Sequence, residues 1–420
     1  MKNISDLLCE KKCTCGKVHN CNIKYVFIEE NAILRIKGIT GQYKNIILVA
    51  DNNTYAVCGE EVKKQIDGRC ENVLVFQTDG FLVPNEDAVK KAQDILSDKT
   101  DLIIGIGSGV IQDLCKYVSF NAKIPYMIVA TAPSMDGYAS VGAAMIMNNM
   151  KITYSAHVPE AIIGDVNILK DAPMDMIKSG YGDILGKYSC LNDWKLSKAI
   201  NGEYFCDYIY NLTYEMLLET KDLGKRLLKR EKDAVKTLTE ALVGVGIAMA
   251  YAGNSRPASG SEHHLSHFFE LTGIMNNEPY FMHGTDVAFS TVYTEGLREE
   301  LLKIKKPCKK IYNVNPESEI KRVYGKAADG VIELQNKLGW YKQDKTEIYK
   351  EKWNEIKEIL NECPKKEELL KYLKSIELDI NEFEKLYGKE KIHDAVLYAK
   401  DLKDRYSVLW LYNSIGDGEL

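Results

Sequence analysis

The sequence lacks the features of several large protein classes. Its most apolar stretch, residues 241–253, is shorter than the roughly 20 residues that a membrane-spanning helix needs. The first residues, MKNISDLLCEKKC, contain neither the apolar stretch nor the small-residue cleavage site of a secretory signal. No charge sign dominates, because 55 basic and 60 acidic side chains give a formal net charge of −5. We therefore expect a cytoplasmic protein with no membrane span and no strongly basic surface for nucleic acid.

A disulfide framework is also missing. The 420 residues include 11 cysteines, an odd number, and most of them stand singly in apolar or helical surroundings. Examples are Cys115, Cys190, Cys206 and Cys363. Without a secretory signal, reduced thiols are the simpler interpretation.

One short segment, CTCGKVHNC, brings Cys13, Cys15, His19 and Cys21 close together in sequence. Its spacing fits neither common zinc pattern well, because a single residue separates the first two cysteines. The segment favours a hairpin with reduced thiols over a structural metal site.

Residues 44–166 alternate short apolar runs with amphipathic stretches. The runs are bounded by polar or turn residues and predict buried strands at NIILVA, NVLVFQ, DLIIGIG, IPYMIVA and AIIGDV. The stretches 86–97 and 112–120 have helical periodicity. This alternation predicts a Rossmann-like parallel sheet covered on both faces. Residues 145–147 and 151–154, separated by Asn148 and Asn149, predict a hairpin appended to that sheet.

The pattern changes after Pro173, where helical periodicity dominates. EIYKEKWNEIKEIL and ELLKYLKSIE repeat apolar residues three and four apart, with charges on the opposite face. The sequence thus predicts an α/β nucleotide-binding domain at 1–171, followed by an all-α metal-binding and substrate domain at 172–420. The cleft between two such domains is the default place for an active site.

A glycine-rich turn, Gly105-Ile-Gly107-Ser-Gly109, lies between a predicted strand and a helix expected to begin near Ile111. Glycines there let the backbone approach a phosphate, and the helix N-terminus supplies N–H groups and a favourable dipole. The turn departs from the dinucleotide fingerprint, because the third glycine is missing and the turn follows a later strand. A tight turn without a ligand is an open alternative.

The segment TAPSMDGYAS follows the next predicted strand. Parallel-sheet proteins place ligand-binding loops beyond the carboxyl ends of their strands. Thr131, Ser134 and Ser140 can donate hydrogen bonds to a cofactor, and Asp136 can accept one from a substrate hydroxyl. A plain polar loop with an Asp–Gly turn is the alternative.

The histidines give the strongest signal, because four of the seven stand close together in the sequence: His263, His264, His267 and His283. Helical spacing places His263 and His267 on one face and His264 elsewhere. Asp183, expected at the start of a helix after a glycine pair, is the candidate carboxylate. Two imidazoles, one carboxylate and open positions form a catalytic-metal arrangement. A surface histidine pair is the alternative, whereas a zinc-protease HExxH motif is excluded by the missing glutamate.

Together these motifs resemble those of the sn-glycerol-1-phosphate dehydrogenases, within the superfamily of dehydroquinate synthases and iron-dependent alcohol dehydrogenases. The resemblance covers most of the chain, and its most specific pieces are TAPSMDGYAS, GDILGKYSCLNDW and SRPASGSEHHLSH. The Lys/Glu-rich C-terminal helices and the cysteine-bearing N-terminus resemble the bacterial branch, which is described as nickel-dependent and dimeric. Archaeal relatives are usually zinc enzymes. The resemblance implies a homodimer with one divalent metal ion, nickel or zinc.

The resemblance also implies roles for individual residues. Asp183, His263 and His283 would bind the metal. His267 would be catalytic and touch the substrate, as would Asp183, and Asp136 would also touch the substrate. NAD(H) or NADP(H) would lie on Asp51, Gly107, Ser108, Gly109, Val110, Ile111, Thr131, Ala132, Pro133, Ser134 and Ser140. A carboxylate at Asp51 favours an unphosphorylated ribose. Val110 and Gln112 stand where relatives often carry Thr and Asn, and Asp286 where many have Gln.

The implied reaction interconverts dihydroxyacetone phosphate and sn-glycerol 1-phosphate by hydride transfer. Position alone suggests Lys187 and Arg256 for the substrate phosphate, with a structural ion pair as an equal alternative for each. Three other functions stay open: a glycerol or polyol dehydrogenase of the same fold, a lyase like dehydroquinate synthase, and a non-catalytic nucleotide-binding relative. SGSEHHLSH looks less like the GHxxGH-type segment of the synthases, which disfavours the lyase.

Overall fold

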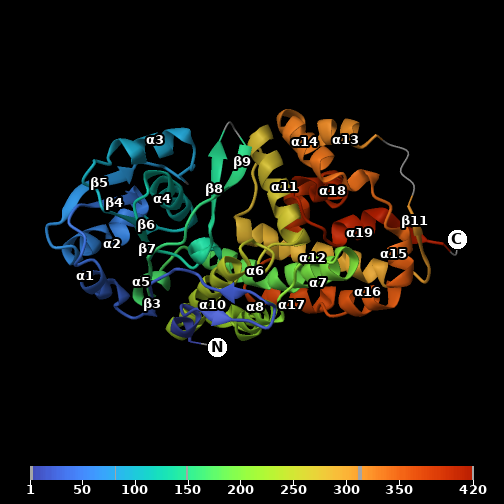
Figure 1. Cartoon of the computed structure of the whole chain (residues 1–420), viewed down its shortest axis with the longest axis horizontal. Helices are drawn as coiled ribbons and strands as arrows, with labels where there is room; N and C mark the ends of the chain where they lie inside the picture. The colour runs from blue at the N-terminus through green and yellow to red at the C-terminus, as the bar shows by residue number, and fades with distance from the viewer. Residues whose placement is uncertain (1–2, 81, 148–149, 311–314, 419–420) are drawn as a thin grey trace. The chain divides into compact units, whose positions relative to one another are not determined.

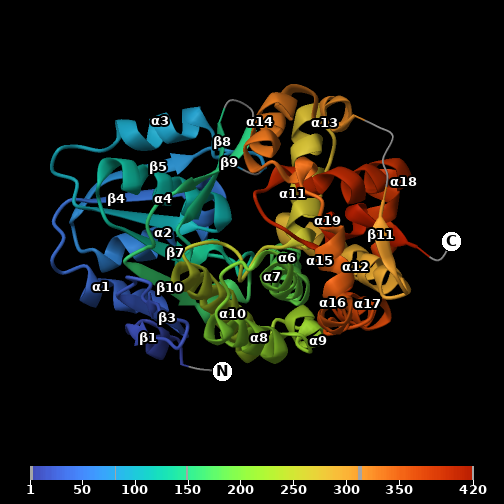
Figure 2. The same cartoon turned by 45° about the vertical axis from the view of Figure 1, so that its right-hand side comes forward.

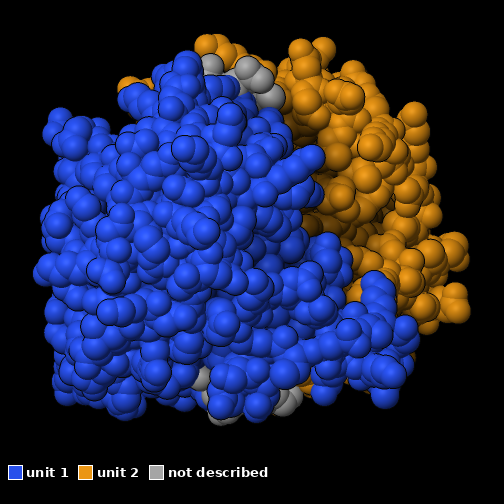
Figure 3. Space-filling model, turned by 60° about the vertical axis from the view of Figure 1, so that its left-hand side comes forward, with its two compact units in different colours: residues 1–184, 218–255 blue, residues 185–217, 256–420 orange. Residues whose placement is uncertain are grey.

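A computed structural model describes residues 3–80, 82–147, 150–310 and 315–418. The chain forms two compact units, 1–184 with 218–255 and 185–217 with 256–420, which Figure 3 shows in different colours. Two of the divisions fall inside helices, so α6 (Met174–Leu185) and α8 (Asp207–Thr220) contribute residues to both units. The predicted domain boundary at residue 171 stays a prediction. The contacts add residues 218–255 to the first unit.

The first unit is built on a six-stranded parallel sheet with the order β3-β10-β7-β6-β4-β5 (Figure 1). Its strands are β3 (Tyr25–Glu29), β4 (Ile46–Asp51), β5 (Cys70–Phe76), β6 (Leu102–Gly107), β7 (Tyr126–Ala130) and β10 (Ala161–Asp165). The five predicted strands are confirmed. The edge strand β3 was not predicted, because its side chains are mostly half-exposed and its short apolar run, YVFI, lies before residue 44, where the predicted alternation of strands and helices begins.

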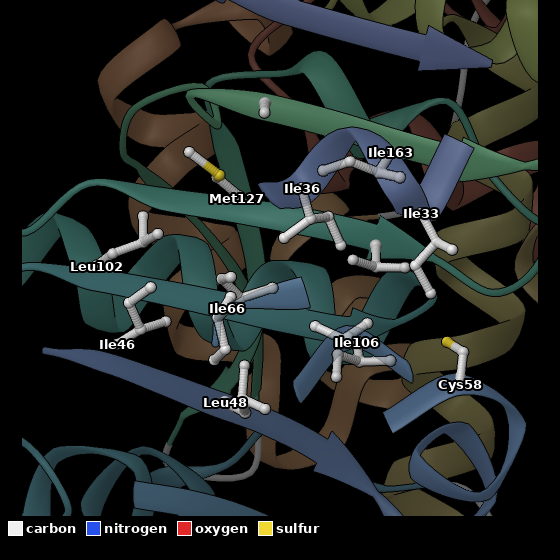
Figure 4. Packing of buried hydrophobic residues seen from close by; sticks show 14 of the residues in the cluster. Ile33, Ile36, Ile46, Leu48, Cys58, Ile66, Leu102, Ile106, Met127 and Ile163 are labelled. Atoms are coloured by element: carbon white, nitrogen blue, oxygen red, sulfur yellow. The ribbon is translucent and has the colours of Figure 1, made fainter. Parts of the chain in front are cut away.

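Helices cover both faces of this sheet, as predicted. On one face, side chains of α2 (Asn52–Gln65), η2 (Ala32–Arg35) and α1 (Ile36–Ile39) form one buried cluster with β4, β6, β7 and β10 (Figure 4). On the other face lies α4 (Gly109–Ala122), whose Cys115 Sγ would be only 2.9 Å from a Cβ added at Gly105. Strands buried on both sides need apolar residues throughout, which explains the continuous runs in the sequence.

The predicted hairpin consists of β8 (Gly142–Met147) and β9 (Met150–Ser155), paired antiparallel. It forms a two-stranded sheet of its own, so its expected attachment to the parallel sheet was wrong. The hairpin contacts α4 instead. The expected turn residues Asn148 and Asn149 lie outside the described part of the chain.

The first unit also contains α9 (Gly224–Leu228), α10 (Lys232–Ala252), α3 (Glu86–Asp94), α5 (Val166–Leu169), η1 (Ile4–Leu7) and η3 (Gly137–Ala139). By length and composition, the 21-residue α10 is the one helix among the described residues that could cross a membrane. This helix is longer than the apolar stretch 241–253, from which the sequence predicted no membrane span. It contacts η3, α5 and β3, and 78% of its most apolar window is buried, as in the core helix of a globular unit.

The second unit is helical, as predicted, apart from a short antiparallel pair of strands, β11 (Pro307–Lys309) and β12 (Ile415–Asp417). Figure 2 shows its helices from a second direction. They are α7 (Lys187–Asn201), α11 (Ser261–Asn276), α12 (His283–Leu301), α13 (Pro316–Tyr324), η4 (Gly325–Ala327), α14 (Ala328–Leu338), η5 (Trp340–Lys342), α15 (Thr346–Glu351), α16 (Trp353–Leu360), α17 (Lys366–Ser375), α18 (Ile380–Tyr398), η6 (Ala399–Leu402) and α19 (Val408–Ser414).

Asp193 of α7 joins three other helices inside this unit. Its carboxylate pairs with Arg298 of α12 at 3.0 Å, and both side chains are fully buried. It also accepts the backbone N–H of Ser261, the first residue of α11, at 2.6 Å and that of Val408, the first residue of α19, at 2.8 Å. Burial raises the pKa of the Asp193 carboxyl group, and Arg298 opposes the shift. One buried anion therefore holds the start of α11, the helix that carries His263.

Replacing this anion should strongly destabilise the second unit. Asp193→Ala would leave the Arg298 guanidinium buried without its carboxylate, which typically costs about 3–5 kcal/mol. We expect a marked fall in the urea midpoint. Asp94→Ala is the control, because Asp94 forms only a surface ion pair with Lys90, and it should change the midpoint little. Equal effects of the two variants would contradict the proposed role of Asp193.

Candidate active site

The carboxyl ends of β4 and β6 lie next to each other where the strand order reverses. From β4 the chain continues to β5 on one side, and from β6 it continues to β7 on the other. Ala50 pairs with Ile106, so Asp51 and Gly107 follow at the ends of adjacent strands. In open α/β sheets, ligands bind at such a switch point. The two strand-end groups predicted to bind the cofactor are thus neighbours.

Asp51 is fixed at the end of β4 by the helix that follows. Its Oδ1 accepts the backbone N–H of Thr54 at 2.8 Å, while Thr54 Oγ1 accepts the N–H of Asp51 at 3.1 Å. This capping box begins α2 and holds the half-buried carboxylate in one orientation. Its role beside a ribose stays a prediction.

The glycine-rich turn closes tightly between β6 and α4. A Cβ on Gly107 would lie 2.6 Å from Ile111 Cβ, so only glycine allows the helix to return so close to the strand. The helix begins at Gly109, two residues before the expected start. The first N–H groups of a helix have no partner within it, and they form its positive end. Ser108, Gly109 and Val110 therefore carry backbone N–H groups that could hold an anion at the switch point.

The loop 131–140 is largely buried and held from several sides. The N–H of Thr131 donates to Gly107 O at 3.1 Å, which ties the loop to the glycine turn. Tyr138 Oη donates to Ala132 O at 2.7 Å, and Ser179 Oγ donates to Ser134 O at 3.1 Å. These bonds involve the loop's backbone, so its conformation is set by the surrounding fold.

Helix α6 approaches this loop through a glycine and carries Asp183 near its C-terminal end. A Cβ on Gly180 would lie 1.8 Å from Pro133 O, so any side chain there would force the helix and the loop apart. The prediction that Asp183 begins a helix was wrong, because the glycines lie inside α6, where this close approach requires one of them. As a result, Asp183 Oδ2 accepts the backbone N–H of Asp136 at 3.0 Å.

Lys116 of α4 anchors the far end of the same loop and was not predicted. Its fully buried ammonium group donates to Gly137 O at 3.1 Å, to Ser140 Oγ at 3.1 Å and to Gly142 O at 2.7 Å. Asp113 lies 3.3 Å away. Burial lowers the pKa of Lys116, and Asp113 opposes that shift. Ser140 is thus engaged within the loop, and its contact with a cofactor stays a prediction.

Three imidazoles gather at the start of α11 and α12. His263 and His267 stand one turn apart on α11 with ring centroids separated by 6.0 Å. The ring of His283, the first residue of α12, lies 5.0 Å from that of His263 and 5.4 Å from that of His267. One ligand atom each of Asp183, His263 and His283 lies within 4.8 Å of the other two. This donor set could hold a metal ion.

Glu262 fixes the orientation of His263. Its Oε1 lies 2.6 Å from His263 Nδ1, and both side chains are buried. A carboxylate can only accept, so Nδ1 carries the proton and the lone pair is left on Nε2. Histidines that bind metals are commonly held this way by a carboxylate. No sequence motif distinguished Glu262 from a solvated helix residue.

Other candidate residues have different surroundings. His264 is fully buried outside the cluster, and neither ring nitrogen has a partner among the described residues. The sequence left two roles open for Arg256, the substrate phosphate or a structural ion pair. In the structure it forms an ion pair with Glu203 at 2.7 Å. Lys187 is buried and donates to Ala258 O at 3.0 Å. Asp286 accepts Tyr387 Oη at 2.8 Å and is buried in a helical core.

Comparison with known proteins shows which class of enzymes the chain resembles. Residues 27–173 match the family model of the iron-containing alcohol dehydrogenases. A sulfoacetaldehyde reductase from Bifidobacterium kashiwanohense, solved in complex with NAD+, superposes with a TM-score of 0.61. The match covers 93% of this chain and 96% of that one at 13% identity, so it supports the fold alone.

Two relatives identify the family within this class. A glycerol-1-phosphate dehydrogenase (NAD(P)+) from Bacillus licheniformis is 28% identical over 413 residues, or 96% of this chain and 92% of the relative. One from Halalkalibacterium halodurans is 33% identical over 297 residues, or 68% of this chain and 73% of the relative. The chain belongs to the glycerol-1-phosphate dehydrogenase family and is an oxidoreductase, as the sequence motifs predicted.

Removing the buried ammonium group should loosen the loop. Lys116→Met keeps the length of the side chain but removes the ammonium group that two backbone carbonyls and Asp113 share. We expect faster amide hydrogen exchange at residues 137–142, measured by mass spectrometry. Lys123→Met, an exposed substitution at the end of the same helix, should leave this exchange unchanged. Exchange that is equally slow in both variants would show that Lys116 does not hold the loop.

Proposed function

We propose that the protein interconverts dihydroxyacetone phosphate and sn-glycerol 1-phosphate with NAD(H) or NADP(H) and one divalent metal ion. Membership in the glycerol-1-phosphate dehydrogenase family supports the substrate and the cofactor. The observation that carries the mechanism is the grouping of Asp183, His263 and His283, whose ligand atoms lie within 4.8 Å of one another.

The residues present fit a divalent ion. Asp183 is a fully buried carboxylate, and buried carboxylates in proteins are commonly paired or bound to metal ions. Glu262 leaves the Nε2 lone pair of His263 available, as a metal ligand requires. Three protein ligands leave a position open for substrate, which is typical of catalytic sites. Such an ion, nickel or zinc, would polarise the substrate carbonyl as a Lewis acid.

The residues at the switch point fit a dinucleotide. The turn at Gly107, Ser108 and Gly109 brings backbone N–H groups to the end of β6, where a pyrophosphate can bind a helix N-terminus. We assign Asp51 to the ribose, and Val110, Ile111, Thr131, Ala132, Pro133 and Ser134 to the rest of the dinucleotide, with Ser140 nearby. The nicotinamide supplies the hydride, and the protein supplies its orientation.

His267 is the residue we assign to proton transfer. Its ring lies 5.4 Å from that of His283 and 6.0 Å from that of His263, and it is partly accessible. A neutral imidazole near the reacting oxygen can hold and deliver a proton at neutral pH. We assign Asp136, whose backbone N–H donates to Asp183, to accept a hydrogen bond from a substrate hydroxyl.

We also propose that the enzyme acts as a homodimer in the cytoplasm. The bacterial resemblance in the C-terminal helices favours nickel as the metal, with zinc as the alternative. Two other functions would use the same residues: a dehydrogenase of unphosphorylated glycerol or a related polyol, and a lyase that returns its NAD unchanged. No contact described above favours either of these over the phosphorylated substrate.

The proposal is tested by the metal dependence of cofactor oxidation. Purified protein should oxidise NADH or NADPH with dihydroxyacetone phosphate. Chelation followed by dialysis should abolish the reaction, and nickel or zinc should restore it, as monitored by absorbance. Faster turnover with free dihydroxyacetone would indicate a polyol dehydrogenase, and substrate conversion without net cofactor oxidation would indicate a lyase. Full turnover after complete metal removal would exclude the proposed mechanism.

Loss of the proton-transfer group should separate chemistry from metal binding. His267→Ala should retain the metal but lower kcat by about 100-fold or more, because general acid–base catalysis contributes roughly 10²–10⁴-fold. Metal content and kcat are both measured. His393→Ala, an exposed histidine on α18, is the control and should behave like the unmodified enzyme. An unchanged kcat in His267→Ala would remove this residue from the proton path.

A further inference from the structure

A second group of metal-ligating side chains lies in the N-terminal hairpin, which has no part in the proposed reaction. The strands β1 (Lys11–Lys12) and β2 (Val18–His19) pair antiparallel. The turn between them, in which Gly16 has a φ of 85°, brings Cys13 and Cys15 close to His19. Cys15 Sγ lies 3.4 Å from His19 Nε2. Three potential ligands therefore converge within a short hairpin.

His19 is oriented as a metal ligand would be. The side chain is fully buried, and its Nδ1 lies 3.2 Å from the carbonyl oxygen of Tyr251 in α10. A carbonyl can only accept, so Nδ1 carries the proton and Nε2 presents its lone pair towards Cys15. The ring also stacks on Tyr251 with centroids 5.4 Å apart. A backbone carbonyl on the remote ring nitrogen is a common support of metal-bound histidine.

The fourth ligand comes from a distant part of the sequence. Cys206, directly before α8, is fully buried, and its sulfur lies within 4.8 Å of the ligand atoms of Cys13, Cys15 and His19. Bond lengths of about 2.3 Å to sulfur and 2.0–2.1 Å to nitrogen put the ligand atoms of a tetrahedral zinc site about 3.5–3.8 Å apart. The observed S···N distance of 3.4 Å is close to that spacing. Cys21 is outside the group, and its Sγ donates to Leu7 O at 3.8 Å.

We propose that Cys13, Cys15, His19 and Cys206 bind a structural zinc ion. Three cysteines and one histidine are a standard set for structural zinc, and four protein ligands leave no position open for a substrate. The three thiols bind as thiolates and release their protons to solvent, while His19 binds as the neutral imidazole. Lys11, Lys12 and Lys17 in the same hairpin offset the resulting net negative charge.

The proposal is tested on the full-length protein in a His263→Ala/His283→Ala background, in which the catalytic metal has lost two ligands. We expect one zinc ion per chain to remain after dialysis. Replacing it with cobalt should give the thiolate-to-cobalt charge-transfer band, which a site of carboxylate and imidazole ligands cannot produce. Adding Cys15→Ser or Cys206→Ser should remove both the zinc and the band. Cys9→Ser, an exposed cysteine in the same segment, should keep both.

A measurement on the unmodified chain covers the case in which the cysteine variants fail to fold. Bound zinc should protect Cys13 and Cys15, but not Cys9, from alkylation by iodoacetamide, and a chelator should remove that protection. Alkylation of Cys13 and Cys15 that does not depend on zinc, a disulfide between these cysteines, or a zinc-loaded background variant without a thiolate band would overturn the proposal. None of these results depends on turnover, so the outcome is independent of the proposed dehydrogenase reaction.

Discussion

The close approach of α6 to the loop after β7 is the constraint on which the site depends. A Cβ at Gly180 would overlap Pro133 O at 1.8 Å, so the helix can reach the loop only because no side chain is present. That contact brings Asp183 to the backbone N–H of Asp136. That contact therefore holds the loop, which we assign to the dinucleotide, beside the carboxylate that we assign to the metal. Gly246 of α10 has a similar relation to the loop, since a Cβ there would lie 2.8 Å from Asp136 O.

Buried charged groups hold the backbone and side chains at positions that set the geometry of the candidate site. Lys116 fixes the loop after β7 through carbonyl oxygens, and Asp193 fixes the start of α11 through a backbone N–H. Glu262 then sets the ring of His263. Each of these groups is expensive to bury, and Lys116 and Asp193 are each bonded to several partners, which is how a protein keeps a charge in its interior. The common result is a site whose side chains are oriented before any ligand binds.

The sequence predicted most of the fold because parallel strands buried on both faces leave continuous apolar runs. It missed β3, whose edge position leaves most of its side chains half-exposed, and it misplaced Asp183, because a glycine inside a helix looks like a helix start until its packing partner is known. Helical spacing placed His263 and His267 on one face, whereas the metal-binding role of His283 came from the family resemblance. The sequence could not predict Lys116 or Glu262, because an interior lysine or glutamate resembles a surface one in sequence. It also could not predict a role for Cys206, because the residues grouped with it are distant in the chain.

The chain enters the second unit at residue 185, returns to the first at 218 and leaves it again after 255. During synthesis, the parallel sheet is therefore complete in sequence long before its last helix, α10, has been made. Until α10 has been made, the apolar surfaces of β3, α5 and η3 that it covers stay exposed. A nascent chain stalled in this interval would expose an aggregation-prone hydrophobic face. A truncated protein that ends at residue 184 would expose it permanently. The interleaved order thus delays completion of the first unit until α10, which ends at Ala252, has been made.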